Sequence, residues 1–419
     1  MRHQTMLNKI FLYKFFDDCV WFYPSIAILL GQNGLNPGWV AAFFALWSLA
    51  SFFGGLFSPS WFIYYGRRST LMRLQTLKLL CFSFWLLFPD PWVFCFAILC
   101  FGLQTSSTNI ALKMMITELN SPEDPRCLSF DLGRFSFISS LAMVVSGIAA
   151  SVFYNSGFEF LLIVTMVFWA MALRVLMELK SSCSIQGSAY PIKSLFRLPK
   201  RLLTLALVPA FTFALLASFG EMYPLILSEA GVGVSLIGYC LALLTLAEAF
   251  GALIFSAFNH FEWIGLAFGL FLFLFSPYTH GLVSVLLITL AIAMIQASIV
   301  RMDALAQWES YTYERSRVAA IREMGAELLV IPLLLLFGQI LNHSGIKLLS
   351  MVISMLLIVF ILILALSTRF SHHLPTLKSN LIRENDLYDW FSSLVGYNRK
   401  MLWLGLCYPS PLQRRMVPD

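Results

Sequence analysis

The chain has 419 residues, of which 59% are hydrophobic and only 12% are charged. A soluble domain carries roughly 25% charged residues, so a chain this long with half that share could not cover a water-facing surface. Its mean hydropathy of +0.79 points the same way. The composition excludes an ordinary soluble protein and indicates that much of the surface faces lipid.

Apolar runs of the length that a bilayer requires, about 20 residues, recur along the chain with turn residues between them. They are too long and too uniformly apolar for the alternating strands of a membrane barrel. The sequence predicts an all-α polytopic membrane protein with about twelve transmembrane helices in two pseudo-symmetric six-helix halves. The predicted spans are residues 10–31, 38–58, 69–88, 92–115, 128–153, 159–178, 202–228, 235–258, 262–276, 282–302, 318–341 and 346–368.

The first apolar run is expected to be retained as a span, because it carries Asp17 and Asp18 and has no small-residue cleavage site typical of a signal peptide. The 8 cysteines form no C-x-x-C pair and have no histidine spacing suited to zinc. Several of them lie inside apolar runs, where a thiol packs as a small apolar side chain. We therefore expect neither a metal site nor a cofactor.

The basic residues fall on alternate loops, as the positive-inside rule requires of a chain with this number of spans. With the N-terminus inside, the outer loops hold essentially one basic residue, Lys347. The net charge of +6 is thus spread over the cytoplasmic rim, which argues against a nucleic-acid partner. We expect a multi-pass protein of a bacterial inner (plasma) membrane with both termini cytoplasmic. The inner basic residues are Arg2, Lys9, Arg67, Arg68, Arg126, Lys180, Lys193, Arg197, Lys200, Arg201, Arg315, Arg317 and those from Arg369 to Arg415.

The two halves carry matching residues in the same order. Tyr23-Pro24 in the first span recurs as Tyr223-Pro224 in the seventh, and Gly54-Gly55 in the second is echoed by Gly251-Ala252 in the eighth. Duplicated halves around a midplane site are a recurring plan of membrane transporters. The expected divisions are a first half at 1–180, a cytoplasmic linker at 181–201, a second half at 202–368 and a cytoplasmic tail at 369–419.

The loop between the second and third spans ends in Gly66-Arg67-Arg68. With the span pattern and the basic central linker, it resembles the signature loop of the major facilitator superfamily, G-x-L-a-D-R-x-G-R-R. The family's first glycine falls at Pro59 and its acidic residue at Ile63, so the charge latch that this residue serves in the family must be altered or absent. The fifth span also lacks the Gly-Pro of the family's antiporters, since residues 145–150 read Val-Ser-Gly-Ile-Ala-Ala. The resemblance implies a small-solute carrier with Gly66, Arg67 and Arg68 as inner-gate candidates. The alternative for these residues is plain anchoring of the topology at the inner face.

Carboxylates inside the predicted spans are the leading functional candidates, because a charge at the bilayer centre costs about 3 kcal/mol or more unless it is paired or faces water. The proton-coupling candidates are Asp18, Glu221, Glu248 and Asp17, although Asp17 could simply face the inner rim. Glu221 and Asp18 occupy comparable places in the two halves. The alternative for each is a structural carboxylate bonded to a neighbouring helix.

A second charged group lies near the inner ends of the spans. Asp131 and Arg134 share a helix face at i, i+3 and are expected to pair, in a structural role. Arg301 and Arg322 could instead bind an anionic substrate. The expected inner-gate residues outside the signature loop are Asp131, Arg134, Arg301, Asp303, Arg322, Glu323 and Glu327.

Uncharged polar residues in the spans are the candidates for lining a substrate cavity. An equally good alternative is that such residues form hydrogen bonds between packed helices. The candidates are Gln104, Asn109, Tyr23, Tyr223 and Gln296.

The leading hypothesis is a secondary active transporter that exports an amphipathic or siderophore-like molecule by alternating access, coupled to protons. The alternatives are an uptake permease for a metabolite or siderophore, and a non-transporting receptor or scaffold with the same fold. No enzyme is expected, because the 6 histidines form no cluster and no H-E-x-x-H motif is present. The expected partners are a small-molecule substrate, protons and the lipid bilayer, with the protein acting as a monomer.

Overall fold

The computed structural model describes residues 2–32, 35–88, 90–120, 125–179, 200–229, 233–254, 261–275, 282–310 and 315–371. It divides into two compact units, Met1–Val359 and Phe360–Asp419. The described part of the chain is helical and contains no strand. The predicted linker at 181–201 and tail at 369–419 lie almost wholly outside the described residues, so these divisions stay predictions.

The first half contains α1 to α7, whose ends follow simple capping rules. The Asn36 side chain accepts a hydrogen bond from Trp39 N at 3.0 Å and Asp90 accepts one from Trp92 N at 2.8 Å, so both residues satisfy exposed amides at helix starts. Proline follows directly at the first position of both helices. The bounds are α1 Arg2–Asp18, α2 Tyr23–Gln32, α3 Pro37–Tyr65, α4 Arg67–Leu87, α5 Pro91–Leu119, α6 Pro125–Val152, the short η1 Tyr154–Ser156 and α7 Phe158–Glu178.

The first predicted span is not one helix, which corrects the sequence-based expectation. It breaks between α1 and α2 at residues 19–22. Side chains of α7 satisfy the backbone at the break: Trp169 Nε1 donates to the carbonyl of Asp17 at 3.0 Å, and Trp21 N donates to Thr165 Oγ1 at 2.9 Å. Irregular backbone is tolerated inside a membrane only where protein groups satisfy it in this way.

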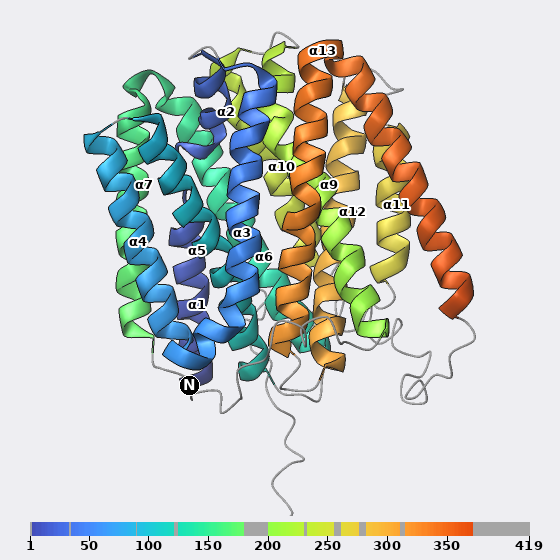
Figure 1. Ribbon diagram of the computed structural model, residues 1–419. Helices are drawn as coiled ribbons and strands as arrows, with labels where there is room; N and C mark the ends of the chain where they lie inside the picture. Colours follow the sequence, from blue (N-terminus) through green and yellow to red (C-terminus); the bar gives the residue numbers. More distant parts are fainter. Residues whose placement is uncertain are drawn as a thin grey trace, which may run out of the picture. The chain divides into compact units, whose positions relative to one another are not determined.

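The second half contains α9 to α13, and Figure 1 shows the ribbon of α13 running one way and then turning back. The last two predicted spans, 318–341 and 346–368, both fall within this element. The bounds are α9 Lys200–Glu229, α10 Val234–Ile254, α11 Phe261–Phe275, α12 Leu282–Glu309 and α13 Arg315–Ser371.

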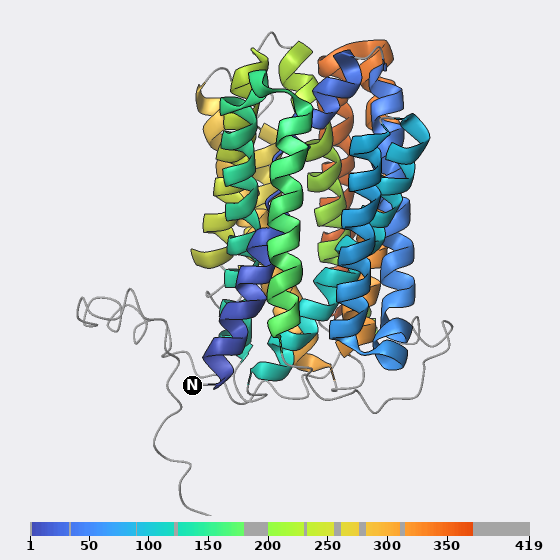
Figure 2. The ribbon, with the colours of Figure 1, turned by 90° about the vertical axis from the view of Figure 1, so that its left-hand side faces the viewer.

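Nine of the described helices are long and apolar enough to cross a membrane, and a shorter apolar helix covers Trp263–Leu272. Figures 1 and 2 show the helices running along a common direction, with α7 beside α1. We call the end of the bundle where α3 meets α4 the Gly66 end, and the end where α6 meets α7 the Gly157 end. Both glycines adopt a positive φ, of 77° and 88°, which suits residues without a Cβ.

The two halves pack through glycines on facing helices. A Cβ at Gly147 of α6 would lie 2.6 Å from the carbonyl oxygen of Gly238 on α10. On α3 and α13, a Cβ at Gly338 would lie 2.4 Å from the Cβ of Ala41, and one at Gly55 would lie 2.8 Å from Met324 Cγ. Small residues allow this close approach of membrane helices. The halves are thus in contact along both helix pairs.

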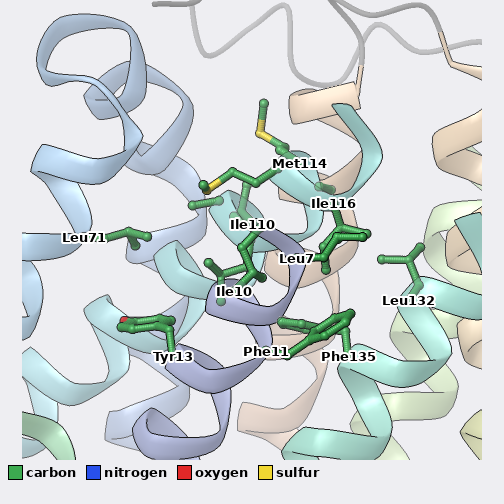
Figure 3. Close-up of a cluster of buried hydrophobic side chains, with 14 of the residues drawn as sticks. Leu7, Ile10, Phe11, Tyr13, Leu71, Ile110, Met114, Ile116, Leu132 and Phe135 are labelled. Carbon is green, nitrogen blue, oxygen red and sulfur yellow. The ribbon is translucent and has the colours of Figure 1, made fainter. Parts of the chain in front are cut away.

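A cluster of buried apolar side chains fills the Gly66 end of the bundle (Figure 3). Leu7, Ile10 and Phe11 of α1 lie there against Ile110 of α5 and Phe135 of α6. The cluster also includes side chains of the second half, namely Ala252, Val300, Ala304, Ala319, Ala320 and Met324. This end is therefore closed by an apolar core that both halves share.

Candidate functional site

A buried ion pair lies inside the first half. Lys78 Nζ of α4 is 2.6 Å from Asp17 Oδ1 of α1, and the two side chains are 0% and 5% exposed. Gln104 of α5 donates to Asp17 Oδ2 at 2.9 Å and accepts from Lys78 at 3.2 Å. Lys78 also lies over the rings of Trp169 and Phe101, at 4.3 and 5.1 Å from their centroids. Both charges are thus matched by polar and aromatic partners, as burial of an ion pair requires.

This arrangement settles where two of the predicted residues lie. Asp17 does not face the inner rim, because its side chain turns into the first half towards Lys78. Gln104 is fully buried in the same network, so it makes the helix-packing hydrogen bonds that were the alternative to a cavity role.

The neighbouring Asp18 has a separate partner. Lys14 Nζ, one turn earlier on α1, is 2.9 Å from Asp18 Oδ2. Ser139 of α6 donates to the same carboxylate, and Lys14 donates to Asn109 Oδ1 of α5 at 2.8 Å. Asn109 is therefore held in this polar group. The two adjacent aspartates each have a lysine of their own, and all four residues belong to the first half.

A cluster of four charged residues joins the two halves at the Gly66 end, and we call it the Gly66-end ion cluster. Lys113 of α5 lies 2.9 Å from Asp303 of α12 and 3.0 Å from Glu323 of α13. Arg322 lies 2.7 Å from Glu323 and 3.4 Å from Asp303. Three of these residues were predicted to build an inner gate, and the structure adds Lys113 from the opposite half.

The signature-like loop has an acidic partner of its own, although not at Ile63. Both terminal nitrogens of Arg67 donate to Glu118 of α5, one of them at 2.7 Å. Arg68 Nε donates to the Leu176 carbonyl at the end of α7 at 3.1 Å. A bidentate arginine–carboxylate pair is geometrically specific. Here it fastens α4 to α5 within the first half.

Two carboxylates of the second half are bound by hydroxyl groups of the first half. The Tyr23 hydroxyl of α2 donates to Glu221 of α9, and Ser48 of α3 hydrogen-bonds Glu327 of α13. We call these two contacts the carboxylate–hydroxyl pairs. Glu327, one of the predicted inner-gate residues, lies within electrostatic range of Glu323 and Arg322 of the ion cluster as well as of Glu221 and Tyr23.

The remaining candidates are not among the residues of the Gly66-end ion cluster or of the carboxylate–hydroxyl pairs. Arg134 Nη1 is 3.7 Å from Asp131 Oδ1, so the predicted pair is present. Gln296 donates to Ser136 across the halves at 2.9 Å, and the Tyr223 ring lies 5.3 Å from that of Phe219. Glu248 is half-buried on α10, and Arg301 is buried on α12.

Sequence reasoning missed the three lysines that organise these groups: Lys14, Lys78 and Lys113. Each stands inside an apolar run, and an ionisable residue at such a place is a functional candidate by default. The spacing of Lys14 and Asp18, one helical turn apart, would have revealed one pair. The partners of the other two lie on different helices and could not be read from spacing.

A small cavity of about 20 Å³ lies beside the Tyr23–Glu221 contact. Its lining comes from Phe22 at the break and from α2, α3 and α5, and it is apolar and largely aromatic, including Tyr23, Trp47 and Phe101. The Tyr23 ring packs edge-on to Trp47 with the centroids 5.5 Å apart. Tyr23 thus connects an aromatic wall in one half with a carboxylate in the other.

No protein-family model and no curated protein sequence matches the chain. Solved structures do match it. The human organic anion transporter MFSD10 (TETRAN) has a TM-score of 0.64 at 15% identity, over 86% of this chain and 99% of that one. A variant of the nucleoside transporter NupG has a TM-score of 0.63 at 13% identity, over 85% and 98%. The chain therefore has the fold of the major facilitator superfamily, which the resemblance of its sequence implied.

Proposed function

We propose that this protein is a secondary transporter that moves a small solute across a membrane by alternating access. The observation that carries the proposal is that two separate sets of polar contacts join the halves. The Gly66-end ion cluster closes one end, and the carboxylate–hydroxyl pairs lie at other levels of the same interface. Because the sets share no residue, one can be broken while the other holds.

The proposed cycle follows from the chemistry of these contacts. Opening the Gly66 end separates Lys113 from Asp303 and Glu323, and water then solvates the separated charges. Opening the opposite end separates Tyr23 from Glu221. Packed interfaces between helices switch between discrete arrangements rather than deforming continuously. A two-state rocking of the halves therefore fits this fold better than gradual deformation.

Several finer features belong to the same proposal. The substrate is an amphipathic or siderophore-like molecule, because the side chains around Tyr23 are largely aromatic and Asp17 and Asp18 of the first half are already paired. Export is coupled to protons through Glu221. The Gly66 end faces the cytoplasm of a bacterial cell, since it carries Arg67 and Arg68. Uptake of a metabolite by the same cycle is the second candidate.

The test locks the Gly66 end. Lys113→Cys and Asp303→Cys are combined in a chain whose native cysteines are replaced, and the protein is reconstituted in vesicles. A panel of labelled amphipathic solutes, nucleosides and organic anions is then screened for transport under an imposed pH gradient. We expect at least one solute to be transported by the reduced double variant and not by the oxidised one.

The single variants, oxidised in the same way, serve as controls and should remain active. Transport that is unchanged after complete cross-linking would show that the Gly66 end does not open. Absence of transport for every solute in both directions would favour the receptor or scaffold reading.

A further inference from the structure

The two carboxylate–hydroxyl pairs share one design. Each carboxylate belongs to the second half, Glu221 to α9 and Glu327 to α13, and each hydroxyl belongs to the first half, Tyr23 to α2 and Ser48 to α3. Four different helices contribute one residue each. A separation of the halves at these contacts breaks both hydrogen bonds.

The charges around these carboxylates do not neutralise them. Among the described residues, neither Glu221 nor Glu327 forms an ion pair with a lysine or arginine, whereas Glu323 is within 3.0 Å of both Lys113 and Arg322. Glu323 and Glu327 are one turn apart on α13. Besides Tyr23, the titratable or charged groups acting on Glu327 are Glu221, Glu323 and Arg322, so two neighbouring carboxylates face one shared cation.

A hydroxyl is a suitable partner for a group that changes its charge. It donates to an ionised carboxylate, and a protonated carboxyl can donate to it in return. While the halves are closed, the two acids are removed from bulk water and lie near each other, which disfavours two simultaneous negative charges. When the halves separate, water solvates both acids. Hydration then stabilises the ionised carboxylates without a protein partner.

We propose that Glu221 and Glu327 form a two-proton clasp: each takes up one proton when the halves close over Tyr23 and Ser48, and releases it when they open. The proposal rests on the proposed alternating access and assigns to Glu327 a coupling role that differs from that of the ion cluster one turn away. Lowering the pH then favours the closed interface, because only the closed state holds both protons.

The experiment measures the separation of the halves directly, without a substrate. Spin labels are placed at Asn155→Cys and His343→Cys, two exposed positions at the Gly157 end on opposite halves, in a chain whose native cysteines are replaced. Pulsed electron resonance then gives the label–label distance from pH 5 to pH 9 in the full-length protein in lipid nanodiscs. We expect the longer-distance population to grow as the pH rises. The slope of the open-to-closed equilibrium against pH should correspond to the release of about two protons per molecule on opening.

The variants separate the clasp from general effects of substitution. In Glu327→Gln or Glu221→Gln, the slope against pH should correspond to the release of about one proton. The double variant should keep the short label–label distance at every pH. Glu159→Gln and Tyr239→Phe, exposed residues outside the clasp, are the matched controls and should behave as the parent.

A two-proton dependence that persists in Glu327→Gln would overturn the clasp, even if solute transport is observed. A distance that does not respond to pH in the parent would also overturn it. Conversely, loss of one proton in each single variant would support the clasp even if no solute were transported, in which case the proposed function alone would fail.

Discussion

The two halves treat their membrane carboxylates differently. In the first half, Asp17 and Asp18 each pair with a lysine of the same half, Lys78 and Lys14. In the second half, Glu221 and Glu327 are bound by hydroxyl groups of the opposite half. A pair within one half moves as a unit when the halves rock, whereas a contact between halves must break. Position relative to the interface therefore distinguishes acids whose partner moves with them from acids whose partner lies on the opposite half.

The largest expected effect comes from leaving one charge of the buried pair alone. Lys78→Met leaves Asp17 without its cation in a site that is 5% exposed, and breaking a buried pair in this way costs about 3–5 kcal/mol. Thermal unfolding of the purified protein should show a large loss of stability. Lys78→Met combined with Asp17→Leu should recover most of it, because no charge is then left unpaired. The matched control is Lys9→Met, which breaks the more exposed pair with Glu178. Equal destabilisation by the control would contradict a special role of burial.

The ion cluster between the halves should respond less strongly. Lys113→Met removes one cation, but Arg322 remains beside Asp303 and Glu323. We expect a loss of about 1–3 kcal/mol and a shift towards a state open at the Gly66 end. A cysteine introduced at Ala304, which is buried in the apolar cluster, should react faster with a water-soluble maleimide in this variant. An unchanged rate would show that Lys113 does not hold this end closed.

A smaller change in stability, with a large change in coupling, is expected at Glu221. Glu221→Gln keeps the shape and a hydrogen-bonding partner for Tyr23, so the unfolding free energy should change by less than about 1 kcal/mol. Gradient-driven transport should be abolished, while exchange at equal pH on both sides persists. Asp18→Asn should give a similar or milder defect in transport. If Glu221→Gln keeps full gradient-driven transport, Glu221 does not carry the proton; if exchange is also lost, it binds substrate or is structural.

The smallest effect is expected at the long pair between Arg134 and Asp131. Arg134 and Asp131 are 3.7 Å apart, and the arginine side chain is 26% exposed. Partly exposed pairs contribute about 0–1 kcal/mol. Arg134→Gln should therefore change the unfolding temperature little and leave transport intact. A loss as large as that of Lys78→Met would show that the pair anchors α6 more firmly than its geometry indicates.

Much of the fold follows from local sequence. Hydropathy and turn residues placed the helices from α4 to α7 within about four residues of their observed bounds, because a lipid-facing helix must satisfy its own backbone and be apolar over its length. The predicted span at 38–58 begins with α3 but stops short of its observed end at Tyr65. The break between α1 and α2 could not be predicted in this way. It depends on Thr165 and Trp169, which reach it from a helix far along the chain.

By itself the sequence determined the helical membrane class, the number of apolar runs and which residues would be costly to place in lipid, since these depend on composition and spacing alone. Only the tertiary structure decided their partners. It brought Lys78 to Asp17 inside one half, joined Lys113 to Asp303 and Glu323 between the halves, and gave Glu221 a hydroxyl instead of a cation. The physical reason is that an ion pair forms where side chains of different helices meet, and helix packing sets that meeting point.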